Sequence, residues 1–451
     1  MRVVLLNLPW QKNERFGIRA GSRWPFTSLP EHDGRIHYFP FPFFLAYATS
    51  LLKKEGKQVK LLDAIAEEIN VDEVIKRIRI FNPELIVIET STPSFKNDIG
   101  LISIIHSDLP YSQIALCGPH ASVFPGGILS KYNFINYILI GEYEFILLEL
   151  VKLLEINSTF ESLKGLAYRR DQEIKINVLR PTVDNLNKLP WPEREDVPIY
   201  KYNDGFAGLP SPNAQMWSSR GCPFKCIFCL WPQTIYNEHR YRIRNPKDVV
   251  NEMEYLIRKY NFKAIYFDDD VFNVSKDHAV SVCEEIKKRK INVPWAVMAR
   301  VDLMDEELLK ILAKAGLYAV KYGIESANKD LLKFCQKDLD LDKAYKIIKI
   351  TKDVGIRVHL TFCLGLPGEN KNTIQNTISF IENAKPDSLQ FSFVTPFPGT
   401  TYYEYAKNHN LLLSKDWCDY DGSYKCVVKL QDLNDRVLDE IRVALLGRYH
   451  I

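Results

Sequence analysis

Two series of short apolar runs alternate with amphipathic stretches along the 451-residue chain. The runs of the first series are rich in β-branched residues and predict five buried parallel strands, at Val3–Leu8, Val59–Asp63, Leu85–Glu89, Ile114–Cys117 and Tyr137–Ile140. Helical periodicity lies between them, at Phe43–Lys54, Val71–Ile80, Asp98–Ser107 and Glu144–Leu154. This order predicts an α/β domain over residues 1–165, with a doubly wound, Rossmann-like sheet.

The second series follows a proline-punctuated stretch at 166–210, which we interpret as a linker. Its runs predict six strands, at Ala214–Ser219, Ala264–Asp268, Trp295–Ala299, Ala319–Gly323, Arg357–Phe362 and Ser388–Phe393. Helices fit between them, at Lys247–Tyr260, Lys276–Lys290, Asp305–Ala315, Leu341–Val354 and Lys371–Asn383. Six parallel strands predict a partial (β/α)6 TIM barrel over 211–400, with its chemistry at the carboxyl ends of the strands. Residues 401–451 form a tail with a helix near Leu433–Leu446.

Composition narrows the class of protein. Lys and Arg number 59 against 56 for Asp and Glu, so no concentrated basic charge suggests a nucleic-acid partner. Nine cysteines are too few for a secreted disulfide scaffold of this length. No apolar stretch is long enough to cross a bilayer, and no signal peptide precedes the first strand. We therefore expect a cytoplasmic protein, at most peripheral to a membrane. The first strand lacks a following glycine fingerprint, which disfavours NAD or FAD.

Three of the cysteines are gathered on one short loop. Cys222, Cys226 and Cys229 follow the first strand of the second series in a Cys-x3-Cys-x2-Cys arrangement. A closed structural zinc site prefers four ligands, and no paired Cys or His lies nearby in the sequence. An iron–sulfur cubane held by three thiolates keeps one iron open for a cofactor. The spacing therefore favours a [4Fe-4S] cluster, with zinc as the alternative.

This loop, with the aromatic Phe228 before its third cysteine, resembles the signature of the radical S-adenosylmethionine (SAM) superfamily. The resemblance covers about Ala214–Thr400. It implies a [4Fe-4S] cluster that reduces bound SAM to a 5′-deoxyadenosyl radical. It also implies an electron donor such as ferredoxin or flavodoxin.

Further segments at successive strand ends resemble the superfamily's cofactor-binding motifs. The resemblance implies contacts to SAM from Phe228, Asp268, Asp269, Arg300, Glu325, Ser326, Gly365 and Pro367. The residues themselves leave alternatives open. Two of the three adjacent carboxylates at 268–270 could instead serve a turn or a helix cap, and Arg300 could form an ordinary salt bridge.

The order of the two domains resembles the branch of the superfamily that carries an N-terminal cobalamin-binding-type domain. Cys117–Ser122 and Gly141–Glu144, each after a predicted strand, carry this likeness. The DxHxxG segment that would supply a histidine to cobalt is absent, and we interpret His120 as a polar turn residue. Cobalamin is thus compatible with the sequence as a third cofactor, resting on fold-level analogy.

A narrower set of segments, at 228–233, 239–242, 267–272 and 361–369, resembles hopanoid-associated radical enzymes and calditol synthase. That resemblance implies ring contraction of a lipid-linked sugar to a cyclopentyl polyol headgroup in membrane lipid biosynthesis. The alternative is a cobalamin-dependent radical SAM methyltransferase that acts on an unactivated carbon. A third reading is a binding module stabilised by an iron–sulfur cluster or by zinc.

The ring-contraction hypothesis gives other residues candidate roles. Cys363 or Cys335 could quench the product radical, although Cys363 also suits a buried strand as a small apolar residue. The aromatic stretch at 10–44 could line an apolar entry, lie on a bilayer or pack between the domains. The basic run His239–Arg244 could contact a headgroup phosphate or clamp the cysteine loop.

Overall fold

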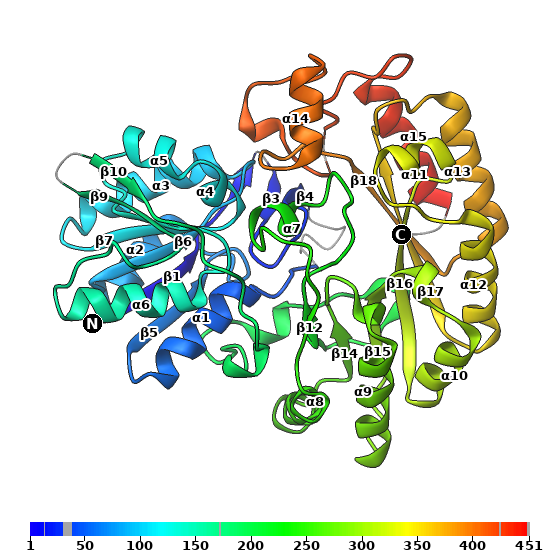
Figure 1. Ribbon diagram of the computed structural model, residues 1–451, viewed down its shortest axis with the longest axis horizontal. Coiled ribbons are helices and arrows are strands. Elements are labelled where there is room, and N and C mark those ends of the chain that lie inside the picture. Colours follow the sequence, from blue (N-terminus) through cyan, green and yellow to red (C-terminus); the bar gives the residue numbers. More distant parts are fainter. Residues whose placement is uncertain (13, 30–37, 171–172, 424, 449–451) are drawn as a thin grey trace.

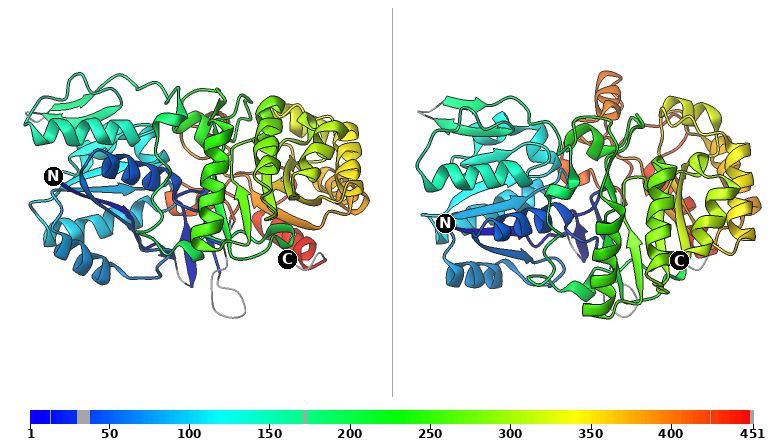
Figure 2. Two further views of the ribbon diagram at one scale, coloured as in Figure 1. Left: turned by 90° about the horizontal axis from the view of Figure 1, so that it is seen from below. Right: turned by 60° about the horizontal axis from the view of Figure 1, so that its bottom comes forward.

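The computed structural model describes residues 1–451 apart from 13, 30–37, 171–172, 424 and 449–451. Two mainly parallel sheets lie side by side, each with its own helices (Figure 1). The same separation is visible from two further directions (Figure 2). The α/β architecture, with a doubly wound domain before a half-barrel, confirms the predicted fold class.

The first sheet has seven strands in the order β10-β9-β8-β7-β6-β1-β5. Its parallel strands are β1 Arg2–Asn7, β5 Gln58–Asp63, β6 Leu85–Glu89, β7 Gln113–Cys117 and β8 Tyr137–Leu139. Helices α1 (Phe43–Lys54) and α6 (Glu144–Glu155) pack on one face. The other face is covered by α2 (Val71–Phe81), α3 (Phe95–Asp108), α4 (Pro119–Val123) and α5 (Pro125–Lys131). The predicted apolar runs therefore form strands of this sheet, because helices bury both of its faces.

Two antiparallel strands extend this sheet beyond residue 165. They are β9 (Leu166–Arg170) and β10 (Glu173–Ile176), and both lie within the stretch that we expected to be linker. β10 is an edge strand with mostly exposed side chains, and such strands carry charged residues rather than an apolar run. The hydrophobic pattern therefore could not reveal β10. β9 is an interior strand, but its buried run is only three residues long.

The second sheet has six parallel strands that follow one another in chain order. They are β11 Asn213–Met216, β14 Ala264–Phe267, β15 Trp295–Ala299, β16 Leu317–Glu325, β17 Arg357–Leu364 and β18 Ser388–Phe393. The helices between them are α8 Pro246–Tyr260, α9 Lys276–Lys288, α10 Glu306–Lys314, α12 Leu341–Asp353 and α13 Lys371–Ala384. β11 and β18 end the sheet without pairing to each other, so the barrel is partial, as predicted.

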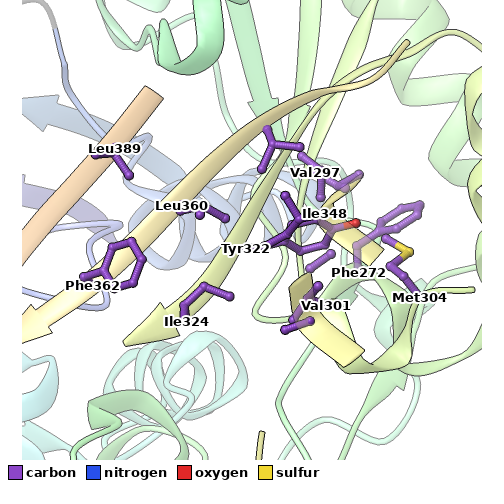
Figure 3. Packing of buried hydrophobic residues seen from close by; sticks show 14 of the residues in the cluster. Phe272, Val297, Val301, Met304, Tyr322, Ile324, Ile348, Leu360, Phe362 and Leu389 are labelled. Carbon is purple, nitrogen blue, oxygen red and sulfur yellow. The ribbon is translucent and has the colours of Figure 1, made fainter. Parts of the chain in front are cut away.

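The helices of the second domain cover only the outer face of its sheet. Figure 3 shows this packing, in which strand residues such as Val297, Tyr322 and Leu360 contact helix and loop residues such as Phe272 and Ile348. Neighbouring residues along β16 to β18 point to the opposite, inner face, which the helices leave uncovered.

Short elements complete the chain. They are β2 Gln11–Lys12, β3 Arg15–Ile18, β4 Phe26–Ser28, β12 Ser219–Arg220, β13 Arg242–Ile243, α7 Leu230–Thr234, α11 Lys329–Phe334, α14 Thr401–Asn408 and α15 Asp435–Arg448. The tail packs back on both domains: the Phe393 amide donates to the Gly422 carbonyl (2.9 Å), and the Gly422 amide donates to that of Pro25 (3.2 Å).

The aromatic stretch at 10–44 packs inside the protein where the structure describes it. Trp10, Phe39, Phe41, Phe43 and Phe44 are all at most 4% exposed. These residues therefore pack between the domains, as one of the three alternatives predicted. Residues 30–37 of the stretch lie outside the described part of the chain. Among the described helices, none is both long enough and apolar enough to cross a membrane.

Candidate functional site

The cysteine loop leaves β12 at Gly221 and ends where α7 begins. Gly221 adopts a left-handed backbone (φ +87°), and a Cβ there would lie 2.0 Å from the Arg240 carbonyl oxygen, so only glycine fits. Burial raises the pKa of Cys222 to about 12 and that of Cys229 well above its usual value. The neighbouring Cys222 and Cys226 thiols raise the pKa of Cys229 further.

Backbone hydrogen bonds hold the loop against the barrel. The Ile227 amide donates to the carbonyl of Cys335 at 3.1 Å, and the Tyr402 amide donates to that of Ile227 at 3.0 Å. The Cys335 side chain is fully buried, so its observed contact with the loop is through its backbone. Its candidate catalytic role stays a prediction.

The three adjacent carboxylates after β14 have separate tasks. Asp269 is buried and accepts hydrogen bonds from the backbone and hydroxyl of Ser218 and from the hydroxyl of Ser219. Asp270 accepts from the Gly221 amide at 2.8 Å, which fixes the start of the cysteine loop. Asp269 and Asp270 therefore have the turn role, which is one of the alternatives that the sequence left open. Because Trp217 and Ser218 form that turn, the expected strand Ala214–Ser219 is divided into β11 and β12.

Arg23, which the sequence gave no reason to select, joins the remaining carboxylate to this network. Its guanidinium contacts Asp268 Oδ1 at 2.9 Å and Asp270 Oδ1 at 2.7 Å. Arg23 comes from the segment between β3 and β4 and lies over the Trp231 ring at 4.6 Å. Nearby, Trp24 contacts Phe228 edge to face, with ring centroids 6.1 Å apart. The N-terminal segment therefore reaches the cysteine loop.

Arg300 lies on the other side of the loop. It forms a bidentate salt bridge with Asp302, donates to the Lys337 carbonyl at 2.9 Å, and stacks over the Phe224 ring at 3.7 Å. The ordinary salt bridge that the sequence left open is therefore present. Contact of Arg300 with a SAM carboxylate stays a prediction.

A second buried network lies at the carboxyl ends of β16 and β17. Glu325 pairs with Lys337 at 2.8 Å and accepts a hydrogen bond from the Cys363 thiol at 3.2 Å. Glu325 has φ +71°, a left-handed conformation that is uncommon for a non-glycine residue and clusters at functional sites. Burial and the Glu325 charge raise the pKa of Cys363, which keeps a thiol proton in place. Ser326 is buried beside it and accepts from the Asn328 amide.

The loop after β17 continues this edge. Gly365 has φ +92° and its amide donates to the carboxylate of Glu369, whose pKa burial raises to about 7. Pro367 lines a groove of about 430 Å³ that α11 and the start of α13 also border. The predicted cofactor residues from Glu325 to Pro367 thus line one continuous edge.

The two domains meet in a buried ionic cluster next to the cysteine loop. Arg242 forms a bidentate salt bridge with Glu142 (2.8 and 2.7 Å), and Arg220 contacts Glu144 at 2.7 Å. All four side chains are at most 3% exposed, and Arg220 directly precedes Gly221. Arg240 pairs with Asp184. The basic run at 239–244 is thus a clamp, so its alternative contact with a headgroup phosphate is wrong for Arg242, whose charge is already paired inside the protein.

His120 is enclosed in the first domain. Its ring packs against Phe95 (4.2 Å) and Phe124 (5.0 Å), and its Nδ1 lies 3.2 Å from the Thr92 hydroxyl. Burial lowers its pKa to about 3, so it is neutral. The prediction of a turn residue is therefore wrong: His120 lies in helix α4 and is buried, because its ring packs among aromatic side chains.

Comparison with known proteins fits this geometry. Residues 218–381 match the family model of the Radical SAM superfamily. The chain is a radical SAM enzyme. It is 29% identical to an uncharacterized methyltransferase of Pyrococcus horikoshii over 90% of this chain and 87% of the relative. It is 27% identical to the anaerobic magnesium-protoporphyrin IX monomethyl ester cyclase of Rubrivivax gelatinosus over 80% of this chain and 66% of the relative.

A solved structure extends the likeness to both domains. The radical SAM methyltransferase TsrM from Kitasatospora setae, with cobalamin and a [4Fe-4S] cluster bound, matches 90% of this chain and 78% of its own. The TM-score is 0.70 at 20% sequence identity, which shows a common fold. None of these three is a cyclopentane-polyol enzyme, so the narrower resemblance to calditol synthase is not supported by them.

The residues present fit the cofactors of a radical SAM enzyme, a [4Fe-4S] cluster and SAM. Three thiols on one glycine-opened loop are the donor set of a cubane with one open iron. Residues 218–381, which include all three cysteines, match the Radical SAM family model, and this match favours a cluster over the zinc alternative.

The fold of the first domain is compatible with cobalamin, although the two glycines of its loops pack against the chain's own backbone. Gly118 and Gly141 have positive φ in the loops after β7 and β8, and a Cβ at Gly118 would meet the Thr90 carbonyl oxygen at 2.5 Å. These loops lie at the carboxyl edge of a doubly wound sheet, where ligands of such folds bind. The enclosed ring of His120 offers no cobalt ligand there.

Proposed function

We propose that this enzyme is a cobalamin-dependent radical SAM methyltransferase that acts on an unactivated carbon. One observation carries the proposal. The loop after β8, with Glu142 and Glu144, binds Arg220 and Arg242 beside the cysteine loop, so the carboxyl edges of the two sheets meet. Ligands held at those two edges would lie next to each other. The similarity to a methyltransferase over 90% of the chain supports the same reaction class.

When bound, the cluster supplies the electron that cleaves SAM, and cobalamin supplies a methyl carrier. Cys222, Cys226 and Cys229 would hold the cluster, and Asp270 would keep the loop in place through the Gly221 amide. Arg23 and Arg300 place positive charge on two sides of the thiolates, as their effects on the pKa values of Cys229 and Cys222 indicate. Burial outweighs this effect and keeps the pKa of both thiols raised, so the bound cluster itself would have to stabilise the ionised thiolates.

The products distinguish this proposal from its rival. The purified protein, reconstituted with cluster and cobalamin, should form methylated product with stoichiometric S-adenosylhomocysteine, because a second SAM is the methyl donor. Ring contraction would yield 5′-deoxyadenosine without S-adenosylhomocysteine. A cobalamin-free preparation is the control, and turnover at an unchanged rate without cobalamin would overturn the proposal.

One observation favours ring contraction on a lipid-linked sugar as a second candidate. The inner face of β17 and β18 offers neutral hydrogen-bonding groups, which suit a sugar. Lipid mass spectrometry of a deletion strain tests this candidate, and unchanged polar headgroups would reject it.

A further inference from the structure

The inner face of the second sheet is polar in successive rows. Parallel register places His359 beside Ser388, Thr361 beside Gln390, and Cys363 beside Ser392. The residues between them, such as Leu360 and Phe391, point outward into the core. Side chains of one row on neighbouring strands share a face, so these six groups form one surface.

This surface carries no net charge. Along the described strands, residues 359–363 of β17 and the whole of β18 place no charged side chain on the inner face. The charges of neighbouring β16 are already paired, Lys321 with Asp204 at 3.1 Å and Glu325 with Lys337 at 2.8 Å. His359 is neutral as well, because burial and the nearby Lys321 charge lower its pKa. A charged ligand would therefore lack a counter-ion here.

Several groups of the surface remain available to a ligand. Gln390 is exposed and donates to the Ser392 hydroxyl at 3.4 Å, and Thr361 and Ser392 are half-buried. Ser388 is already engaged, because its hydroxyl accepts from the Ala207 amide at 3.0 Å and lies 2.7 Å from His359 Nδ1. His359 is 5% exposed and packs against the Phe206 ring (centroids 5.4 Å apart), and its Nε2 meets no hydrogen-bond partner among the described residues. The hydroxyl of Tyr266, on the same sheet, is also buried and unpartnered. Such groups are costly unless a ligand or water satisfies them.

We propose that this inner face, centred on Thr361, Gln390 and Ser392 with His359 beneath, binds a neutral, hydroxyl-rich part of the substrate, such as a sugar or polyol. Hydroxyl, amide and neutral imidazole groups each combine donor and acceptor capacity, as a ligand hydroxyl does. A flat apolar ligand would leave these groups unpaired on burial. The strands run from this surface towards Glu325 and the cysteine loop, so the substrate would extend towards the reacting centre. The assignment rests on the proposed function for its reaction and deepens it with a substrate class.

Binding measurements test the proposal without turnover. Saturation-transfer NMR would use the full chain, reconstituted with its cluster and SAM, and myo-inositol and glucose as probes. We expect both probes to bind, and Gln390→Leu and Thr361→Val to weaken binding by roughly fivefold or more each, the loss of about one hydrogen bond. Gln375→Leu, on the exposed side of α13, is the matched control and should bind as the parent does. Thermal melting and cluster absorbance verify that each variant folds.

Three results would overturn the assignment. These are no transfer to either polyol, equal polyol affinity in the parent and both variants, or succinate or tryptophan responding to the variants in place of the polyols. The proposed function is judged separately by S-adenosylhomocysteine formation. Variant-sensitive polyol binding without methyl transfer would reject the methyltransferase proposal alone, and methyl transfer without polyol binding would reject the substrate class alone.

Discussion

The two sheets of this enzyme are both mainly parallel, but helices cover both faces of the first sheet and only one face of the second. In the first sheet β6 is buried at every position, and β1 and β7 at nearly every one, because helices cover both sides. In the second sheet β18 alternates between buried and accessible residues, because helices cover only its outer face. The first sheet can therefore offer a ligand only its carboxyl edge. The second offers its edge and the accessible inner-face residues of β17 and β18, whereas Phe206 and Leu209 cover the inner face of β14 to β16.

This difference in burial gives the two domains different roles. A sheet buried on both faces is a rigid support for its loops, and the loop after β8 uses that support to hold the cysteine loop through Glu142 and Glu144. The open face of the second sheet provides hydrogen-bonding groups beside the same loop. Four predictions test this division, beginning with the largest expected effect.

The cysteine loop should carry the chemistry. Cys226→Ala removes one of three cluster ligands, so we expect iron and sulfide content to collapse and SAM cleavage to fall to the level without enzyme. Anaerobic reconstitution followed by product chromatography measures both. Cys418→Ser, in the half-buried tail, is the control and should keep its cluster. Full turnover by Cys226→Ala without a cluster would reject radical SAM chemistry and place the reaction elsewhere.

The stability of the junction between the two sheets should depend on its buried charged side chains. Arg242→Met leaves Glu142 without its bidentate partner, and such a change costs about 3–5 kcal/mol of unfolding free energy. The double variant Glu142→Gln/Arg242→Met should recover much of that loss. Arg240→Met, in an exposed pair of the same basic run, should cost under about 1 kcal/mol. Urea unfolding compares them, and equal losses for Arg240 and Arg242 would refute the clamp.

The carboxyl end of β6 should make stability depend on pH. Burial raises the pKa of Glu89 to about 7, from 4.5, so its stabilising contribution is full below pH 4.5 and is lost as pH rises through 7. Glu89→Gln should abolish this fall, which amounts to about 3 kcal/mol at most. Unfolding midpoints at pH 5, 7 and 8 measure it, with exposed Glu73→Gln as control. Parallel pH profiles for Glu89→Gln and the parent would contradict the expectation.

A reciprocal pair of substitutions compares the two sheets directly. Val87 in β6 is fully buried, so Val87→Thr places a hydroxyl without a partner in the core and should cost about 1–3 kcal/mol. Thr361→Val on the inner face of β17 should change the unfolding free energy by less than about 0.5 kcal/mol. Chemical denaturation of the protein without cofactors measures both. Similar costs would mean that both faces of the second sheet are buried.

Local patterns determined much of the fold and part of the site. Apolar runs identified every parallel strand to within a few residues, because a buried strand has to exclude polar side chains from both faces or from one. The spacing of Cys222, Cys226 and Cys229 predicts the metal centre, since three thiols on so short a loop stay together in any fold. The pattern did not predict β10, because an exposed edge strand carries no apolar run, nor β9, because its buried run is only three residues long.

The sequence also did not predict which charged residues far apart in the chain form ion pairs, for a different reason. Nothing local in Arg23 indicates that it pairs with Asp268, 245 residues away, or that Arg242 pairs with Glu142. The adjacent carboxylates Asp269 and Asp270 look alike in sequence, yet one binds Ser218 and the other the Gly221 amide. The roles of these side chains can be assigned only from the folded structure, because the role of a charged side chain depends on the groups that folding places beside it.

The sequence by itself thus determined the two α/β units and their strands and predicted the three cluster ligands, because these follow from local pattern and spacing. Tertiary structure alone decided that the two carboxyl edges meet at a buried ion cluster, that the basic run is a clamp, and that accessible polar groups line the inner face of β17 and β18. Those features depend on contacts between segments far apart in the chain, and no local pattern records them.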